Sequence, residues 1–215
     1  MTTAMGETTR ERILRVAAEL FAVKGYGATG VAELAAAANI GKGALYHHIG
    51  SKEQLLYEIS KRHVEEPLAD GEEILQRDLP ADEKLRLLSR RQMRVIADHQ
   101  PEITVYFREG HYLNGERQKE LQVVRDRWES VWRTCLQQGV DEGVLRSADT
   151  IVVKGVLGIF NYSWVWLHTD GSLSPDEIAD RLADLVLHGE LVRMFPIDYE
   201  PNADRRQHDV PVRQR

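Results

Sequence analysis

Residues 31–50 read VAELAAAANIGKGALYHHIG, and this stretch decides the fold of the first part of the chain. It holds two short helical patterns, over 31–38 and 42–48, and a tight turn at 39–41 joins them. The first pattern is rich in alanine, which lets the two helices cross closely. Two short helices joined by such a turn, with polar groups on the second, are typical of a helix-turn-helix.

The second of these helices is expected to present a row of residues that suit DNA. Lys42 stands at its start, where recognition helices meet base edges. Gly43 and Ala44 allow a close approach of the backbone, and Ala44 suits contact with a thymine methyl. Tyr46 and His47 are expected to donate to phosphates. Two ordinary interpretations stay open, namely Lys42 as a solvated surface cation and Tyr46 as a core aromatic.

The chain around this motif supplies further candidates. Ser51 and Gln54 have the spacing of a capping box, in which each side chain bonds the backbone amide of the other, and we expect a fourth helix to begin there. Lys52 lies beside the free amides of that helix start, which suits a phosphate. His48 is expected to pack against the first helix rather than touch DNA. The arginines of the first helix are expected to be surface charges: Arg10, Arg12 and Arg15.

The remaining sequence has helical periodicity and little alternation, so we expect an all-α protein of about nine helices. The first helix is predicted over 8–24, with Thr8 or Thr9 as its cap, and Pro67 near the end of the fourth or at a kink in it. The later helices are expected to follow Pro80 and then to cover 102–109, 116–140, 150–168 and 175–194. The segment 196–215 has few apolar residues and is predicted to be disordered.

Composition and charge exclude several classes of protein. The 215 residues include one cysteine, Cys135, so an internal disulfide is excluded and a reducing cytoplasm is expected. No apolar run approaches the roughly 18 residues that span a bilayer. The net charge of −6 is unusual for a nucleic-acid binder, but residues 1–64 carry +2 and the remainder −8. This asymmetry suggests two functions in one chain.

The helix-turn-helix lies inside a longer run that is specific to one family. The signature is Leu-Tyr-x-His at 45–48 followed by Ser-Lys-Glu-x-Leu at 51–55. The rest of the matching run is Ile13-Leu14, Ala17, Leu20-Phe21, Gly25-Tyr26, Thr29-Gly30-Val31, Leu34-Ala35, Gly43-Ala44 and Ile49. With these residues, 8–64 resemble the DNA-binding domain of the TetR family of transcriptional repressors. The resemblance implies a three-helix DNA-binding domain over 8–66 and a ligand-binding and dimerisation domain over 67–195.

Two glycines depart from the family pattern. Gly30 and Gly41 replace the usual Ser or Thr at the starts of the second and third helices. Glycine is an acceptable N-cap, but two hydroxyls that would reach DNA are lost. The remaining candidates for DNA contact are Thr29, Lys42, Gly43, Ala44, Tyr46, His47 and Lys52. Ile49 replaces the usual Phe, which should affect packing more than recognition.

The C-terminal part is rich in aromatic residues, and the resemblance implies that its helices form a ligand pocket. An apolar pocket with a few polar groups suits a small molecule, although an aromatic-rich core is the ordinary interpretation. The candidate ligand-binding residues are Tyr106, Arg108, His111, Arg125, Trp128, Trp132, Phe160, Tyr162 and Trp164. The family's last two helices form a dimer, for which the candidates here are Gly155, Gly158, Ile178, Leu182, Leu185 and Val186.

A looser resemblance, over 100–190, is to TetR-type regulators of fatty-acid and sterol catabolism. It rests on Val105 to Glu109, Trp128, Trp132, Glu142-Gly143, Tyr162 to Leu167 and Gly171 to Ser174. That subgroup often responds to acyl-CoA thioesters, and arginines near an aromatic slot suit the phosphates of the coenzyme. We therefore expect a homodimeric repressor of a palindromic operator, released by an acyl-CoA or another hydrophobic or aromatic compound. An activator or dual regulator of the same fold remains the alternative.

Other classes of function find little support in the sequence. His47-His48, the His63 region and the Glu109-His111 pair lack the spacing of a metal site, and no phosphate loop or nucleophile elbow is present. Cys135 lies within a helix with no base beside it in the sequence. We therefore expect no enzyme, no catalytic residue, no cofactor, no metal and no membrane partner. A helical enzyme or an interaction module without DNA binding remains the alternative class.

Overall fold

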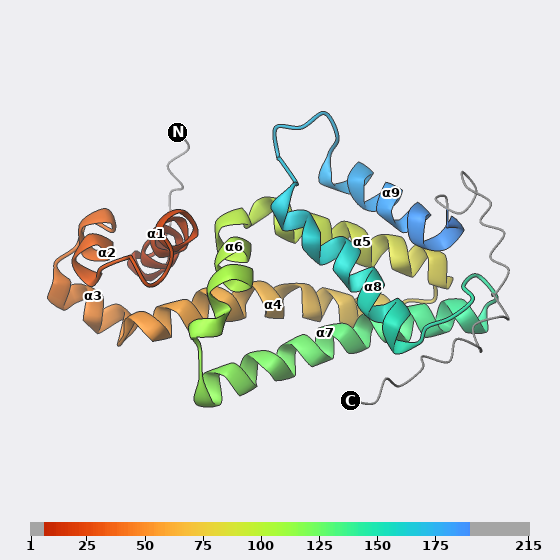
Figure 1. The fold of residues 1–215 in the computed structure, drawn as a ribbon, viewed down its shortest axis with the longest axis horizontal. Helices are drawn as coiled ribbons and strands as arrows, with labels where there is room; N and C mark the ends of the chain where they lie inside the picture. Colours follow the sequence, from red (N-terminus) through yellow and green to blue (C-terminus); the bar gives the residue numbers. More distant parts are fainter. Residues whose placement is uncertain (1–6, 190–215) are drawn as a thin grey trace, which may run out of the picture.

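The path of the chain is described from residue 7 to residue 189 by a computed structural model, and in this range its regular secondary structure is entirely helical, without strands. The predicted all-α fold is therefore confirmed (Figure 1). The nine α-helices of the described range are α1 (Thr9–Lys24), α2 (Val31–Ala37), α3 (Lys42–Ile49), α4 (Lys52–Gln76), α5 (Ala81–Asp98), α6 (Gln100–Glu109), α7 (Gly115–Asp141), α8 (Thr150–Asn161) and α9 (Pro175–His188). Two short 3₁₀ helices are η1 (Gly110–Tyr112) and η2 (Tyr162–Val165). The segment predicted to be disordered, 196–215, lies outside the described residues.

Local capping signals in the sequence explain where helices begin. Thr8 and Ser174 each cap a helix with a complete capping box, to α1 and α9 respectively. Ser51 caps α4 by accepting from the Gln54 amide at 3.0 Å. The second half of that predicted box is wrong, because the Gln54 side chain donates instead to Glu58, one turn later, at 2.9 Å. Another hydrogen-bond acceptor on the same helix can thus take the side chain that would complete a capping box.

Two predicted helix ends need correction. The helix predicted to reach residue 168 ends at Asn161 and continues as η2. Its end is stabilised by Ser163, whose hydroxyl donates to the Phe160 carbonyl at 2.6 Å and whose own carbonyl accepts from Leu167 N at 2.8 Å. The last helix ends at His188, and Gly189 follows in the left-handed conformation with φ 56°. Pro67 lies inside α4, which continues to Gln76.

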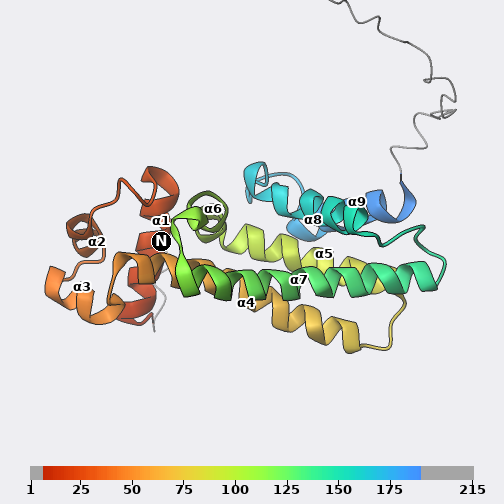
Figure 2. The same cartoon turned by 60° about the horizontal axis from the view of Figure 1, so that its bottom comes forward.

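Two large hydrophobic clusters form most of the core, and a third, small one joins α5 to α6 through Val95, Ile96 and Ile103. The head cluster joins α1, α2 and α3 to the start of α4, and Leu34, Leu45 and Leu55 are among its fully buried members. It also includes Val105 of α6 and the beginning of α7, so the first three helices do not pack alone. The body cluster joins α4 beyond residue 63 to α5, α7, α8 and α9. Helix α4 contributes to both clusters and runs beside α7 along the body (Figure 2).

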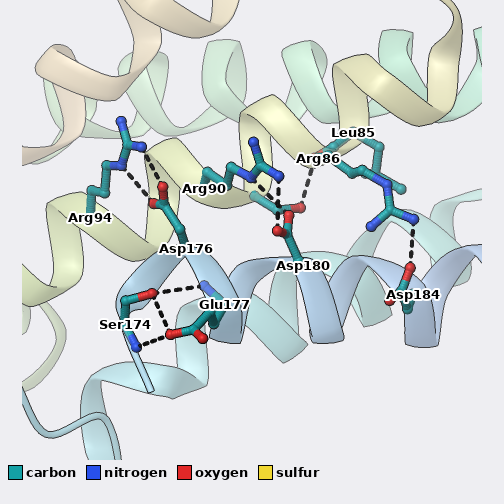
Figure 3. A network of polar contacts seen from close by, with 10 residues as sticks. Leu85, Arg86, Arg90, Arg94, Ser174, Asp176, Glu177, Asp180 and Asp184 are labelled. Carbon is teal, nitrogen blue, oxygen red and sulfur yellow. Dashed lines mark hydrogen bonds and ion pairs between the residues drawn. The ribbon is translucent and has the colours of Figure 1, made fainter. Parts of the chain in front are cut away.

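A ladder of ion pairs fastens α9 to α5. Arginines spaced four residues apart on α5 face aspartates spaced four residues apart on α9, with the two helices antiparallel (Figure 3). The pairs are Arg86–Asp184, Arg90–Asp180 and Arg94–Asp176. Arg90 binds Asp180 through both Nε and a terminal nitrogen, each at 2.8 Å. The three pairs oppose small shifts of α9, because a shift of one or two residues along α5 would separate all of them.

No helix within residues 7–189 is both long and apolar enough to cross a membrane.

Candidate functional site

Helix α3 carries one buried and one exposed face. Leu45 and Ile49 pack into the head cluster, which turns the opposite side of the helix outward. Tyr46 lies on that outer side with 44% of its surface exposed, so its interpretation as a core aromatic is wrong. The other predicted contact residues of this helix are all exposed: Lys42, Gly43, Ala44 and His47. The helix carries no carboxylate, so nothing on it repels a phosphate.

The start of α3 leaves backbone donors free of side-chain caps. Gly41 is its N-cap and makes no side-chain hydrogen bond, and a Cβ at this position would meet nothing within 4 Å. The first amides of a helix have no partner within the helix and favour anions. The glycine that departs from the family pattern thus leaves room for close approach to the backbone of α3.

Two other predicted DNA contacts lie in different surroundings. Thr29 is 1% exposed, and its hydroxyl donates to the Gly25 carbonyl at 2.9 Å. The structure therefore contradicts its prediction as a DNA contact, because the hydroxyl closes the turn after α1. Lys52 is half-buried, with its ammonium 4.2 Å from the ring centroid of Tyr26, and burial lowers the pKa of Lys52. Its contact with DNA stays a prediction.

Basic residues of α1 pair with neighbouring carboxylates. Arg10 forms an ion pair with Glu58 of α4, and Arg15 pairs with Glu7 and Glu19. These pairs agree with their interpretation as surface charges, since each arginine is already neutralised within the chain.

A cavity of about 290 Å³ lies in the body, walled by α4, α5, α6, α7 and α8. Three of the predicted ligand-binding residues line it, namely Tyr106, Arg125 and Trp128. Apolar side chains complete much of the wall, among them Ile103 and Leu157. A concave apolar site with a few polar groups is the usual form of a small-molecule site.

The other six predicted ligand residues lie outside this lining, and two of them belong to the core. Trp132 and Phe160 are 0% exposed, with ring centroids 4.9 Å apart in the body cluster. The spacing that placed Trp132 on the same helical face as Trp128 was correct, but that face continues from the cavity into the packed core.

The remaining four lie nearer the surface or the head. Trp164 stacks on Phe107 at 5.8 Å, and Tyr162 is 64% exposed. Arg108 donates to the Ala22 carbonyl of α1 at 3.2 Å. His111 lies in η1, beyond the cavity-lining part of α6. Their assignment to the pocket is not supported, because the sequence shows which residues are aromatic or basic but not toward which side they turn.

Charged residues border the cavity in both signs. Lys154 pairs with Glu129, and Asp126 accepts from the Gln122 amide at 2.6 Å. Arg125 lies 5.8 Å from the ring centroid of Tyr106 and forms no ion pair within the described part of the chain. Arg125 is therefore the cation that an anionic ligand would meet without displacing a carboxylate.

Sequence reasoning missed three amides in the cavity wall, Gln92, Gln122 and Asn161, of which Gln92 and Asn161 bond each other. Gln92 of α5 donates from Nε2 to the Oδ1 of Asn161, the last residue of α8, at 3.0 Å. The only sequence signal is that Gln92 lies one turn from Leu88 and Ile96, both fully buried, on the inward face of its helix.

Helix α6 connects the cavity to the head. Its middle lines the cavity through Ile103 and Tyr106, and its end contacts the head through Glu109. The Glu109 carboxylate is 8% exposed and accepts from the backbone amide of Tyr26 at 3.1 Å. The Tyr26 ring also packs against Tyr112 of η1, at 5.1 Å between centroids. A displacement of α6 would thus reach the loop between α1 and α2.

The residues predicted at a dimer interface lie on α8 and α9 and differ in exposure. Gly155 and Gly158 are exposed with open space around them. Ile151, on the same side of α8, is 80% exposed, which is unusual for an isoleucine. On α9 the four candidates are half-buried, and Ile178, Leu182 and Val186 pack against the body cluster of the same chain, whereas Leu185 does not belong to that cluster. Dimerisation through this surface stays a prediction.

The described residues contain no group of three or more His, Cys, Asp or Glu that could hold a metal ion. Cys135 is buried, and burial raises the pKa of its thiol to about 12, so the reactive thiolate is scarce at neutral pH.

Comparison with known families gives two matches that together follow most of the chain. Residues 13–59 match the family described as bacterial regulatory proteins, tetR family. Residues 78–190 match the family described as tetracyclin repressor-like, C-terminal domain.

Individual relatives are similar over nearly their whole length. The HTH-type transcriptional repressor KstR2 of Rhodococcus jostii (strain RHA1) is 30% identical over 184 residues, which cover 84% of this chain and 90% of the relative. The crystal structure of the TetR family regulator PfmR from Thermus thermophilus has a TM-score of 0.77 and 37% identity, covering 82% of this chain and 97% of PfmR. The structure of AibR in complex with isovaleryl coenzyme A and operator DNA has a TM-score of 0.74 and 26% identity, covering 84% and 98%.

Proposed function

Because the chain belongs to the tetR family of bacterial transcriptional regulators, we propose that it is a repressor that a small-molecule effector releases from its operator. The DNA-binding unit is 8–66 and the effector-binding and dimerisation unit 67–195. The main support for this proposal is that α6 both lines the cavity and contacts the head through Glu109. The protein has no catalytic role in this proposal and acts in the cytoplasm.

DNA binding would use the outer face of α3 in two copies of the chain. A two-fold dimer through α8 and α9 would place the two α3 helices about one DNA turn apart, ~34 Å or somewhat more, on a palindromic operator. Lys42, Gly43 and Ala44 would meet base edges, while Tyr46, His47 and Lys52 would meet phosphates. Because the head carries little net positive charge, affinity would depend on two heads binding together.

The effector would occupy the cavity of the body. At about 290 Å³ the cavity suits one acyl group or one or two rings rather than a whole coenzyme thioester. An acyl-CoA would place its acyl part among Tyr106, Trp128 and Leu157 and its phosphates outside, near Arg125. The AibR complex with isovaleryl coenzyme A supports this class. Another hydrophobic or aromatic compound is the second candidate, favoured by the balanced charges at the cavity.

Release would follow from the two helices that border both regions. Val64 and Pro67 of α4 line the cavity, and the same helix begins in the head cluster. An effector that binds better when α4 and α6 are displaced shifts the protein toward a head spacing that no longer fits the operator. Activation by the same movement is the alternative, and the sign of regulation depends on where the operator lies.

The experiment measures binding of the full-length protein to its own promoter DNA, at fixed salt, with and without acyl-CoAs of increasing length. Lys42→Ala and Tyr46→Ala are each expected to weaken operator binding by about tenfold or more, because each removes a contact made by both chains of a dimer. Helical circular dichroism and the dimer mass should stay unchanged. Lys119→Ala, an exposed lysine of α7 away from α3, is the matched control.

Wild-type affinity in both α3 variants would remove this face from the DNA site. A broad acyl-CoA panel that leaves operator affinity unchanged would eliminate the thioester effector and leave the second candidate class to be tested.

A further inference from the structure

The amide pair in the cavity wall has more hydrogen-bonding capacity than the protein uses. Gln92 is 7% exposed, and its Nε2 donates to Asn161 Oδ1. The other polar atom, Gln92 Oε1, is buried and has no hydrogen-bond partner among residues 7–189. Buried side-chain oxygens nearly always accept a hydrogen bond. An acceptor without a donor therefore lies in the wall of a ligand-sized cavity.

A purely structural role accounts for only half of this arrangement. The bond from Gln92 Nε2 to Asn161 Oδ1 joins α5 to α8 and needs no second polar atom. An apolar residue at 92 would avoid the unsatisfied oxygen if filling the core were the only requirement. A glutamine here is explained better by a donor that arrives with a ligand.

The same contact leaves a donor on Asn161. Its Oδ1 accepts from Gln92, and its Nδ2 has no hydrogen-bond partner in the part of the chain that the structure describes. The pair thus offers one free acceptor and one free donor on adjacent side chains. A hydroxyl group both donates and accepts, and so satisfies the two atoms together, whereas a ketone or an ether only accepts and a methyl group does neither.

The residues around the amide pair restrict the kind of ligand that could bring such a hydroxyl group. The wall next to the amide pair is apolar, with Val95, Leu157 and Trp128 among its members. Among the charged residues that border the cavity, Lys154 pairs with Glu129 and Asp126 accepts from the Gln122 amide, whereas Arg125 forms no ion pair within the described residues. A ligand that reached the amides would therefore have an apolar skeleton with an isolated hydroxyl.

We propose that the cavity selects effectors that carry a hydroxyl group on their apolar part, which donates to Gln92 Oε1 and accepts from Asn161 Nδ2. The proposal rests on the proposed function, since it names the chemistry of the effector that the same cavity takes. Gln92 is then a specificity-determining residue, because its acceptor is left unsatisfied by a ligand without the hydroxyl.

The test compares ligands that differ by one oxygen atom. The probes are 6-hydroxyhexanoyl-CoA against hexanoyl-CoA, and 4-hydroxycyclohexanecarbonyl-CoA against cyclohexanecarbonyl-CoA. Binding to the full-length protein is followed by tryptophan emission, since Trp128 lines the cavity, and release from promoter DNA is measured in parallel. We expect the wild-type protein to bind the hydroxylated member of at least one pair about fivefold or more tightly.

The variant Gln92→Met removes both polar atoms with little change in volume. It should abolish the preference for the hydroxyl and leave the affinity for the unhydroxylated member equal or higher. Gln137→Met makes the same chemical change on the exposed side of α7, where Gln137 donates to Asp141, and should keep the preference. Thermal unfolding of both variants checks the fold, and the wild-type comparison is decisive without either of them.

The outcomes separate the two proposals. Equal wild-type affinity within both pairs, or a preference that survives in Gln92→Met, overturns hydroxyl selection and leaves the effector cavity standing. If none of the four thioesters binds or releases the operator, hydroxyl selection is overturned, and the broad acyl-CoA panel decides separately whether the effector is a thioester.

Discussion

The DNA-reading face and the cavity differ in how their residues come together. The face occupies 42–47, a single stretch on one short helix whose buried side is fixed by Leu45 and Ile49. The cavity draws its wall from five helices, between Val64 and Asn161. A site made of neighbours in sequence is oriented by one local periodicity, whereas a site made of distant residues depends on how every helix is rotated.

The two large hydrophobic clusters show a matching difference. The head cluster is built largely from the first four helices, and the body cluster from helices far apart in the chain. They meet at α4 and at α6, so the head and the body can unfold either separately or as one unit. All four tryptophans lie beyond residue 127, which makes tryptophan emission a signal from the body alone.

The largest effects are expected from truncations in the two clusters. Leu45 and Leu88 are both 0% exposed, one in each cluster, and replacement of either by alanine should lower the free energy of unfolding by about 2–5 kcal/mol. Leu45→Ala should weaken operator binding while tryptophan emission stays native, and Leu88→Ala should shift the emission midpoint in urea. If the urea midpoints measured by tryptophan emission and by circular dichroism are identical in both variants, the head and the body unfold as one cooperative unit.

A medium effect is expected at Gly71, where α4 approaches α7 closely. A Cβ there would lie 2.6 Å from Trp128 Cζ3 and 3.0 Å from Val131 Cγ1. Gly71→Ala should therefore destabilise the protein by about 1–3 kcal/mol and move Trp128 at the cavity wall, seen in the melting temperature and the emission spectrum. Gly110→Ala is the control, because its Cβ would meet nothing within 4 Å. If Gly71→Ala leaves the melting temperature and the emission spectrum unchanged, the contact between α4 and α7 can adjust to the added methyl group without loss of stability.

The smallest effect is expected from the α5–α9 ladder, because its ion pairs are partly exposed. Asp176→Asn should lower the free energy of unfolding by about 0–1 kcal/mol at pH 7. Its hydrogen bond with Arg94 holds the pKa of Asp176 below its ordinary value of 3.8. The contribution is thus complete above that value and is lost as the pH falls through the lower pKa of the folded state.

Urea unfolding of the wild-type protein and Asp176→Asn between pH 7 and pH 3 checks this dependence. The stability difference should shrink only at the acid end, and Asp170→Asn, at an exposed loop position, should show none. A difference that stays constant to pH 3 would assign the effect to packing rather than to charge.

Local signals allowed much of the fold to be predicted, and their failures have identifiable causes. The caps at Thr8 and Ser174 are formed by residues three apart, so the sequence contains both partners. The second half of the box at Ser51 failed because Gln54 bonds Glu58 and also accepts from Arg117 of α7, 63 residues away. Competition from a distant helix is not visible in a local pattern.

The residues of the candidate site also divide into those that local sequence patterns predicted and those that only the folded structure places. The exposure of Lys42, Tyr46 and His47 followed from the periodicity of one helix. Thr29 was misassigned because a turn directed its hydroxyl to a backbone carbonyl. Trp132 was misassigned because aromatic character suits a core and a pocket equally well.

The sequence by itself determined that this protein is all-helical, where its recognition helix begins and which side of that helix faces outward. These features depend on interactions within a few residues, through helical periodicity and capping. Only the tertiary structure decided which aromatics line the cavity, that Gln92 and Asn161 meet there, and that Glu109 contacts the head. Those contacts depend on the relative rotation and register of helices, which packing and long-range ion pairs set after the helices form.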